Sequence, residues 1–389
     1  MQLEKLAFSE LSGTDREWSV SSFSIGQINL IVGRNAAGKS RVLNCISSLA
    51  SLITKKPDSL WASGTWNVEL SQDARVYSLQ IVIEDSKVKS EMLSIDGHEK
   101  LSRGPDGRGE MWSEKLQQNL EFKIPVDTLA IYQRRDEIQH PYIEDLFGWA
   151  NSVRKYPFGS EFGKSMIWAT SFTDNSETPS DATKPAVIEP EHVVKLYSLG
   201  SEKFGDQFEK QILVDLARVG YDCERIVAEP VDFQIDGSMP LALIGKLPIS
   251  LSIKERDLPG VTRQFEMSMG MYRCVALIIN MNFSLFSGDS SSILIDDIGE
   301  GLDYERSTAL IDLLIDRCGD GKIQLIMTSN DKFIMNEVDL SFWHIIDRHG
   351  NKVQILDYKN SSAAFEKFKF LGLSNFDFFA NKAYLNTIQ

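Results

Sequence analysis

One stretch of the sequence decides the fold, and it reads Gly33-Arg34-Asn35-Ala36-Ala37-Gly38-Lys39-Ser40. It matches the pattern GxxxxGK[ST]. Phosphate groups carry several negative charges, and converging backbone N–H groups at the start of a helix bind them. Gly33 and Gly38 allow the tight turn and the close approach of the backbone, while Lys39 is expected to reach the β- and γ-phosphates and Ser40 to ligate Mg²⁺. The pattern therefore predicts a site for ATP and Mg²⁺.

The segments on both sides of this loop have the required context. Residues 27–32 form an apolar run that is typical of a buried strand, and residues 41–53 carry apolar side chains at helical spacing. An ordinary glycine turn between a strand and a helix is the alternative. The residues of this region that we expect to bind the nucleotide are Gly33, Arg34, Asn35, Ala36, Ala37, Gly38, Lys39, Ser40 and Arg41.

A second motif consists of two carboxylates, Asp296 and Asp297, that follow the apolar run 293–295. In a nucleotide site, the first carboxylate would hold Mg²⁺, and the second would orient or deprotonate the attacking water. Two aspartates after a strand are by themselves more typical of a turn. Because a phosphate-binding loop precedes them in the same chain, we favour the metal site.

A third motif, residues 267–273, opens an apolar segment that predicts a helix to about residue 286. Ser268 and Gly270 stand at its start, where a serine often only caps the helix. A hydroxyl at a helix N-terminus also forms an anion site. If this site faces the γ-phosphate held by another copy, ATP joins two copies into a dimer.

The rest of the chain suggests an α/β protein with two additions to its core. We expect residues 1–63 and 126–140 to form the first part of the ATPase core, with 126–132 as a strand, and residues 226–389 to form the second part. Short β-rich runs separated by turns predict an antiparallel β lobe over residues 64–125. Residues 141–225 predict a helical lobe that contains a mobile loop at 169–185, which is rich in Ser, Thr, Asp and Pro.

Composition limits the class of protein. Of 389 residues, 42% are hydrophobic and 25% charged, which is ordinary for a soluble protein. No apolar run approaches the ~20 residues that cross a bilayer, and the N-terminus lacks a signal-peptide pattern, so no membrane partner and a cytoplasmic location are expected. The four cysteines are far apart, which argues against disulfides or zinc. The net charge, 41 − 55 = −14, disfavours non-specific attraction to nucleic acid.

The order of the three motifs resembles the ABC ATPase superfamily, in its structural-maintenance-of-chromosomes (SMC) and RecF-like branch. Residues 33–40 are similar to the Walker A form GPNGAGKS, and residues 267–271 to the LSGGQ signature. Residues 296–303 resemble DEPTSALD, with Asp303 at the D-loop aspartate. The resemblance implies a P-loop NTPase core, a nucleotide sandwiched between two copies, and a Q-loop glutamine that assists catalysis and the metal. Gln133, after the predicted strand, is the first candidate for this glutamine and Gln139 the second, although each can be a surface amide.

Two positions depart from the family pattern. Asp297 stands where a catalytic glutamate is usual and is one methylene shorter, so hydrolysis can be slow. The H-loop has no histidine, and Ser329 takes its place. Trp18 or Phe23 could stack on adenine, but core packing explains an aromatic in a β segment equally well.

Within this branch, the chain resembles compact bacterial ATPases labelled AAA-family ATP-binding proteins, several of which belong to phage-defence systems such as Septu, PARIS and retrons. Residues 268–273, 296–303 and 328–331 carry this resemblance. It implies a homodimer, or a higher oligomer, that controls a separately encoded effector. The alternatives are a RecF-like ATPase that clamps DNA, a transporter's nucleotide-binding subunit, and an ATP-gated scaffold with little turnover.

Overall fold

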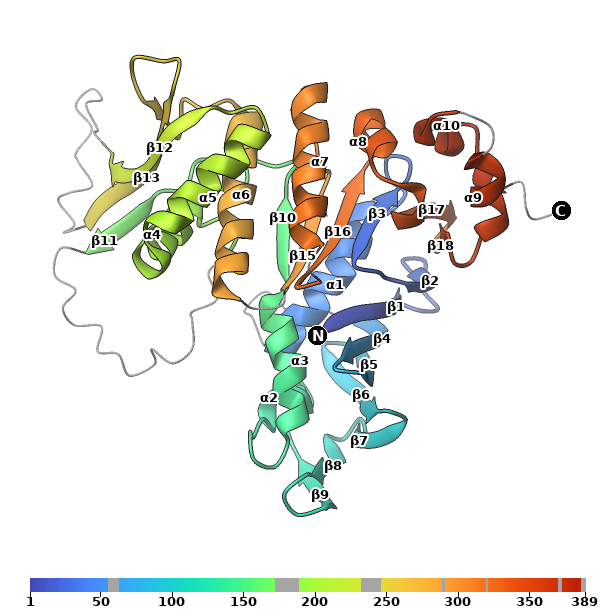
Figure 1. Cartoon of the computed structure of the whole chain (residues 1–389). Coiled ribbons are helices and arrows are strands. Elements are labelled where there is room, and N and C mark those ends of the chain that lie inside the picture. Colours follow the sequence, from blue (N-terminus) through green and yellow to red (C-terminus); the bar gives the residue numbers. More distant parts are fainter. Residues whose placement is uncertain are drawn as a thin grey trace. The chain divides into compact units, whose positions relative to one another are not determined.

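The computed structural model describes residues 1–54, 63–171, 189–231, 246–288, 291–319, 321–369 and 373–385. The chain divides into two compact units, which Figure 1 labels element by element. The first contains residues 1–155, 290–297 and 318–389, and the second contains residues 156–289 and 298–317.

The first unit is built on a mixed sheet whose parallel part carries the first two predicted motifs. Strand β3 (Ile28–Val32) lies between β16 (Ile323–Ser329) and β17 (Trp343–His349), and β15 (Ser291–Asp296) pairs with the other edge of β16. All three pairings are parallel. Every described residue of β3 and β16 is buried, as expected for parallel strands covered on both faces. The carboxyl ends of β15, β16 and β3 therefore meet at one edge of the sheet.

The same sheet continues into a part that is antiparallel except for the parallel pairing of β18 with β2. Beyond β17 the order is β18, β2, β1, β4, β5, β6, β7, β8 and β9. The bounds of these strands are β18 Lys352–Asp357, β2 Trp18–Ser24, β1 Gln2–Glu10, β4 Ser63–Gln72, β5 Arg75–Glu84, β6 Lys87–Ile95, β7 His98–Arg103, β8 Arg108–Ser113 and β9 Gln118–Lys123. The hairpins from β4 to β9 confirm the predicted inserted antiparallel lobe.

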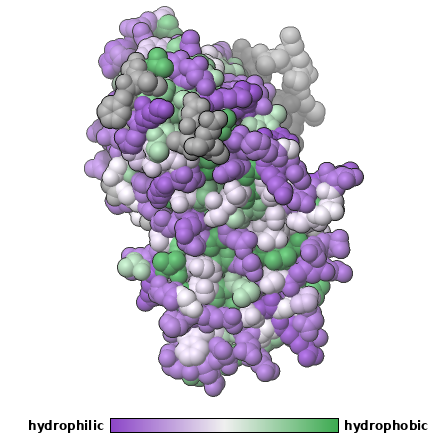
Figure 2. Space-filling model, turned by 90° about the vertical axis from the view of Figure 1, so that its right-hand side faces the viewer, coloured by the Kyte–Doolittle hydropathy of each residue, from purple (hydrophilic) through white to green (hydrophobic). Residues whose placement is uncertain are grey.

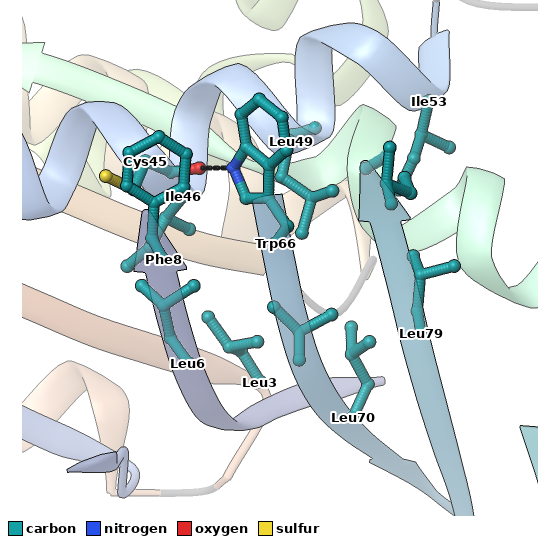
Figure 3. Packing of buried hydrophobic residues seen from close by; sticks show 14 of the residues in the cluster. Leu3, Leu6, Phe8, Cys45, Ile46, Leu49, Ile53, Trp66, Leu70 and Leu79 are labelled. Carbon is teal, nitrogen blue, oxygen red and sulfur yellow. Dashed lines mark hydrogen bonds between the residues drawn. The ribbon is translucent and has the colours of Figure 1, made fainter. Parts of the chain in front are cut away.

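Helix α1 (Lys39–Thr54) covers this sheet and carries the end of the phosphate loop. Figure 3 shows the core between α1 and strands β1, β4 and β5, where Ile46 and Leu49 of the helix lie against Leu6, Trp66 and Leu79. The indole of Trp66 donates a hydrogen bond to the Cys45 carbonyl at 3.0 Å, so its polar atom is satisfied although the ring is buried. The packed core fixes the helix on which Lys39 and Ser40 stand.

Further helices of the first unit are α2 (Ala130–Gln133), α3 (Pro141–Ser152), α8 (Lys332–Glu337), α9 (Ser362–Lys369) and α10 (Asn375–Ala380). Helix α3 packs on α1. In α10, the buried ring of Phe378 lies 4.8 and 4.7 Å, between ring centres, from Phe365 and Phe368, so this aromatic C-terminal helix packs against α9.

The second unit combines a small antiparallel sheet with a group of helices. Strand β13 (Lys246–Glu255) pairs with β11 (Trp168–Ser171), β12 (Cys223–Pro230) and β14 (Thr262–Arg263). Helices α4 (Val193–Phe204) and α5 (Asp206–Arg218) pack on α6 (Met269–Ser287), and α7 (Tyr304–Cys318) follows the D-loop. Strand β10 (Arg154–Pro157) carries the chain from the first unit into the second.

The units do not follow the predicted boundaries. Helix α3 of the predicted helical lobe belongs to the first unit, and the boundary at 225/226 falls inside β12. The second unit continues to residue 289, because β12 pairs with β13 and β13 with β11, a pairing distant in sequence. Residues 169–171 of the predicted mobile loop belong to β11, and its remainder lies outside the described residues.

The hydrophobic helix α6 covers the apolar segment that the sequence predicts as a helix to about residue 286. Among the described residues it is the one helix long and apolar enough, by composition alone, to cross a membrane, with a mean hydropathy of 1.2. However, 72% of the apolar stretch of this helix is buried inside the protein, so α6 is the core helix of the second unit. The face of the molecule in Figure 2 is largely hydrophilic, with apolar residues interspersed among polar ones.

Candidate functional site

The phosphate loop begins at the carboxyl end of β3 and passes into α1. Two of its residues have left-handed backbone conformations, Ala36 with φ of 61° and Gly38 with φ of 111°. The value at Gly38 requires glycine, because side chains with a Cβ rarely adopt it. A Cβ there would also lie 3.4 Å from the ring of Trp18. The ring of Trp18 therefore packs closely against the phosphate loop at Gly38.

Trp18 supports the loop and does not offer a face for a base. Only 2% of its surface is exposed, and the guanidinium of Arg41 lies 4.3 Å from its ring centre. Arg41 also forms an ion pair with Glu10. Phe23 is buried as well, with its ring 5.8 Å from that of His344. Of the two readings of these aromatics, core packing is the correct one.

Lys39 is the cation of the loop. It is 7% exposed, and its Nζ donates to the Gly33 carbonyl at 3.2 Å. Burial lowers the pKa of Lys39, while the carboxylates of Asp297 and Asp296 oppose this shift. These two carboxylates therefore lie near enough to act on the lysine through their charges.

Asp296 lies at the centre of the hydrogen bonds of the site. Its Oδ1 accepts from Ser40 Oγ at 2.9 Å and from Thr328 Oγ1 at 2.7 Å. The same Thr328 hydroxyl accepts the backbone N–H of Asp297 at 2.9 Å. Thr328 is fully buried at the end of β16. One hydroxyl thus fixes both aspartates of the second motif.

Asp297 has a left-handed backbone, with φ of 54°. This conformation is uncommon for a residue with a side chain, although aspartate tolerates it better than most. Because it follows the last residue of β15, the chain turns sharply there, and Asp297 leaves the line of the strand.

Two further polar residues hold the outer side of the phosphate loop. Asn330 donates to the side chain of Asn35 at 2.6 Å, and Arg348 donates to the Ala36 carbonyl at 2.7 Å. Ser329 is 1% exposed and pairs in register with Val32, the residue before Gly33. Its Oγ accepts the backbone N–H of Asp331 at 3.1 Å. The predicted H-loop position therefore lies beside the start of the phosphate loop.

The predicted environment of Gln133 is wrong. Residues 126–132 do not form a strand, because the chain enters helix α2 at Ala130 and Gln133 ends that helix. Gln133 is exposed, and Gln139 lies in the following connection, where its backbone carbonyl accepts from Glu114 at 2.8 Å. In the part of the chain that the structure describes, no hydrogen bond joins either glutamine to the phosphate loop. Their assignment to the Q-loop remains a prediction.

The second unit brings together the other three predicted residues. Ser268 caps α6 by accepting the backbone N–H of Met271 at 3.2 Å, as the simpler reading of this serine expects. Gly270 lies in the first turn of this helix against the D-loop. Asp303 accepts the backbone N–H of Arg306 at 2.9 Å at the start of α7 and pairs with the Arg306 side chain. These bonds lower the pKa of Asp303.

Sequence reasoning missed four residues that shape these two sites. Thr328 and Asn330 flank Ser329 in a motif already singled out, and a hydroxyl at the end of a buried strand could have pointed to the first of them. Arg348 and Arg273 reach backbone carbonyls that lie far away in sequence. No local pattern indicates such contacts.

Residues 28–336 of the chain match a family model described as "AAA domain, putative AbiEii toxin, Type IV TA system". The match spans all three motifs. No curated protein matches the chain.

Solved structures with a similar fold include SMC head domains. An SMC head bound to the C-winged helix domain of ScpA has a TM-score of 0.51 and 11% identity, over 92% of this chain and 97% of that one. The SMC head of Thermotoga maritima has a TM-score of 0.47 and 12% identity, over 92% and 99%. The SMC head with an extended coiled coil from Pyrococcus furiosus, bound to the C-terminal domain of ScpA, gives 0.49 and 10%, over 95% and 99%. The first of these confirms the predicted fold class.

Proposed function

Since the chain belongs to the family described as "AAA domain, putative AbiEii toxin, Type IV TA system", we propose that it binds and hydrolyses ATP as a homodimer whose two copies enclose the nucleotide. This ATPase cycle would control a separately encoded effector in bacterial defence against phage. The reaction is the attack of water on the γ-phosphate, which yields ADP and phosphate.

The observation that best supports the ATPase proposal is the hydrogen bond between the side chains of Ser40 and Asp296. The hydroxyl that ends the phosphate loop and the carboxylate that ends β15 lie 2.9 Å apart, although 256 positions separate them in sequence. Hard oxygen donors of this kind suit Mg²⁺. When bound, the metal would be held by Ser40 and Asp296 and would neutralise charge on the phosphate oxygens.

The other residues of the first unit have roles that follow from their charges and positions. Lys39 would bind the β- and γ-phosphates, and the backbone N–H groups of residues 33–40 would surround them. Asp297, at the turn that follows β15, would accept the proton of the attacking water, with Ser329 as a polar group at the end of the neighbouring strand β16. Because Asp297 is shorter than glutamate, we expect slow turnover.

The dimer is supported by the position of Ser268 and Gly270 at the first turn of a long helix. A helix N-terminus carries a partial positive charge, which suits a γ-phosphate. In the superfamily that the motifs resemble, this segment closes over the nucleotide of the other copy. Asp303 at the D-loop would lie at the same contact.

Turnover and self-association together test this function. We expect Lys39→Ala and Asp296→Asn to abolish ATP hydrolysis and ATP-dependent dimers in mass photometry. Ser268→Arg is expected to leave ATP binding by the single copy intact, because Lys39 and Ser40 are unchanged, but to abolish dimers and turnover. The exposed Arg218→Ala serves as a matched surface control. Dimers and turnover that persist in Ser268→Arg would disprove the shared site.

The effector role is tested by expressing the chain with its neighbouring genes. We expect co-purification of a second protein, whose nuclease or toxin activity changes with ATP. We also expect protection against phage that Lys39→Ala removes. The family description, which names a TA system, supports a function shared between two components. Protection by the chain alone, without any neighbour, would contradict this part of the proposal.

A further inference from the structure

Arg273 is a buried cation behind the signature segment. It stands five positions after Ser268 in α6 and is 7% exposed. Its three guanidinium nitrogens donate to three backbone carbonyls, Nε to Ser160 at 2.8 Å, Nη1 to Glu300 at 2.8 Å and Nη2 to Gly159 at 3.0 Å. Its hydrogen-bond partners are carbonyl oxygens, its guanidinium carbon lies 5.9 Å from the centre of the Phe158 ring, and no carboxylate of the described residues forms an ion pair with it. The guanidinium thus joins three segments of the second unit.

The signature segment and the D-loop are packed directly against each other. A Cβ on Gly270 would lie 2.6 Å from the Gly301 carbonyl oxygen and 2.9 Å from the Leu302 side chain. A Cβ on Gly301 would lie 3.0 Å from Nη1 of Arg273. Any side chain at Gly270 would therefore displace the D-loop backbone, and the two segments cannot move apart without breaking the bond to Glu300.

We propose that Arg273 is a positioning residue that fixes the signature segment and the D-loop as one body, so that both meet the nucleotide of a second copy in a single closing step. The inference rests on the proposed function, because it assigns how the shared site is assembled. Arginine suits the task, since its planar fork of five N–H donors can reach three acceptors at once. Lysine has a single nitrogen on a flexible stem and cannot reach the adjacent carbonyls of Gly159 and Ser160 and that of Glu300 at the same time.

The charge of Arg273 adds to this geometric role. Hydrogen bonds from a charged donor are stronger than neutral ones, so these three hold the loops firmly. In addition, a buried positive charge without a carboxylate partner remains near the N-terminus of α6, where it reinforces the positive end of the helix dipole. Both effects favour a site for the γ-phosphate of the partner copy.

Mixing two inactive variants tests the proposal. Arg273→Ala retains its phosphate loop and Lys39→Ala retains its signature segment, so a heterodimer of the two contains one intact site. We expect each variant alone to lose at least about tenfold in turnover. Because Lys39→Ala is expected not to dimerise with itself, at least about half of the dimers are heterodimers with one intact site of two, so the mixture should recover roughly a quarter to a half of the parental rate. Ser268→Arg mixed with Lys39→Ala is the reference for a residue of the signature itself.

The outcomes separate the inference from the function on which it rests. If the mixture of Ser268→Arg and Lys39→Ala recovers no turnover, no shared site exists, and both the proposed function and the role of Arg273 are disproved. If that mixture recovers turnover but the mixture of Arg273→Ala and Lys39→Ala does not, Arg273 acts only within its own copy. In that case only the inference about Arg273 is overturned. ATP binding by single copies of Arg273→Ala should stay within about twofold of the parent, and Arg273→Lys should recover only part of the turnover.

Loss of stability is distinguished by two controls. Arg317→Ala removes another arginine of the second unit, one that pairs with the buried Asp215 in the helices away from the signature. Even if Arg317→Ala lowers the melting temperature as much as Arg273→Ala does, it should lower turnover much less. Arg218→Ala, which breaks an exposed pair with Asp316, should change neither quantity. Equal loss of turnover in Arg317→Ala and Arg273→Ala would overturn the positioning role.

Discussion

At the scale of single residues, Thr328 controls the geometry of the nucleotide site most directly. Its hydroxyl donates to Asp296 and accepts the N–H of Asp297, so one side chain holds the carboxylate of the first aspartate and the backbone of the second. β-Branched residues are restricted about χ1, which keeps this hydroxyl in place. The residue touches no phosphate in the proposed mechanism and acts through the two aspartates.

We predict that Thr328→Val lowers the turnover number about tenfold to a hundredfold, because hydrogen bonds to charged groups contribute about 1.5–3 kcal/mol. Valine has the same shape but leaves the Asp297 N–H without its acceptor. ATP binding should change much less, since Lys39 and the loop are untouched. Steady-state turnover and nucleotide titration measure the two effects. Thr328→Ser, which keeps the hydroxyl, is the control, and turnover of the valine variant within twofold of it would refute the role.

A site residue can be predicted from the sequence when the residues that surround it in space are also close to it in the chain. The phosphate loop was predicted because strand, turn and helix follow one another directly. Asp296 was predicted from its strand, but its contact with Ser40 depends on the pairing of β3 with β16 and of β16 with β15. Trp18 offered two readings that only its burial could separate.

At the scale of elements, helix α2 shows how a distant contact overrides local pattern. Residues 126–132 are apolar and suggest a strand, but the buried carboxylate of Glu91 accepts the N–H groups of Ala130 and Ile131 at 2.7 and 2.8 Å. These are donors that a new helix leaves without partners. Arg103, opposite Glu91 in the hairpin β6–β7, donates to the carbonyls of Thr128 and Pro125. The inserted lobe thus determines the path of the chain toward Gln133.

We predict that Glu91→Gln destabilises the protein by about 3–5 kcal/mol, because removal of one partner leaves the other charge buried and unpaired. Glu91 and Arg103 both have fully buried side chains, with 3.5 Å between Oε2 and Nη1. The amide can also accept only one of the two helix N–H groups well. Urea unfolding measures the change. Glu99→Gln makes the same substitution at an exposed position of β7 and should stay within about 0.5 kcal/mol of the parent. A loss below about 1 kcal/mol at position 91 would show that the pair does not fix α2.

At the scale of the whole molecule, each of the two units combines segments that are far apart in sequence, and each contains a different group of motifs. The first unit contains the phosphate loop, both aspartates and Ser329, whereas the second contains Ser268, Gly270 and the D-loop. The chain enters the second unit twice, and the short segment 290–297 returns Asp296 to the first. Sequence patterns gave the class of fold and the inserted lobe. They did not give the boundaries, because strand pairings such as β11 with β13 join segments nearly 80 positions apart.

The charge of the whole chain favours an effector-controlling ATPase over a DNA clamp. With a net charge of −14, the protein repels phosphate backbones on average, so we predict that duplex DNA is not retained in filter binding at about 0.15 M salt, with or without ATP. A clamp would bind DNA only in its ATP-bound dimer, and its affinity would fall steeply with salt as counterions are released. Lys39→Ala, which changes the total charge by one unit but cannot close on ATP, is the control. Retention that requires ATP, weakens with added salt and disappears in Lys39→Ala would establish the clamp instead.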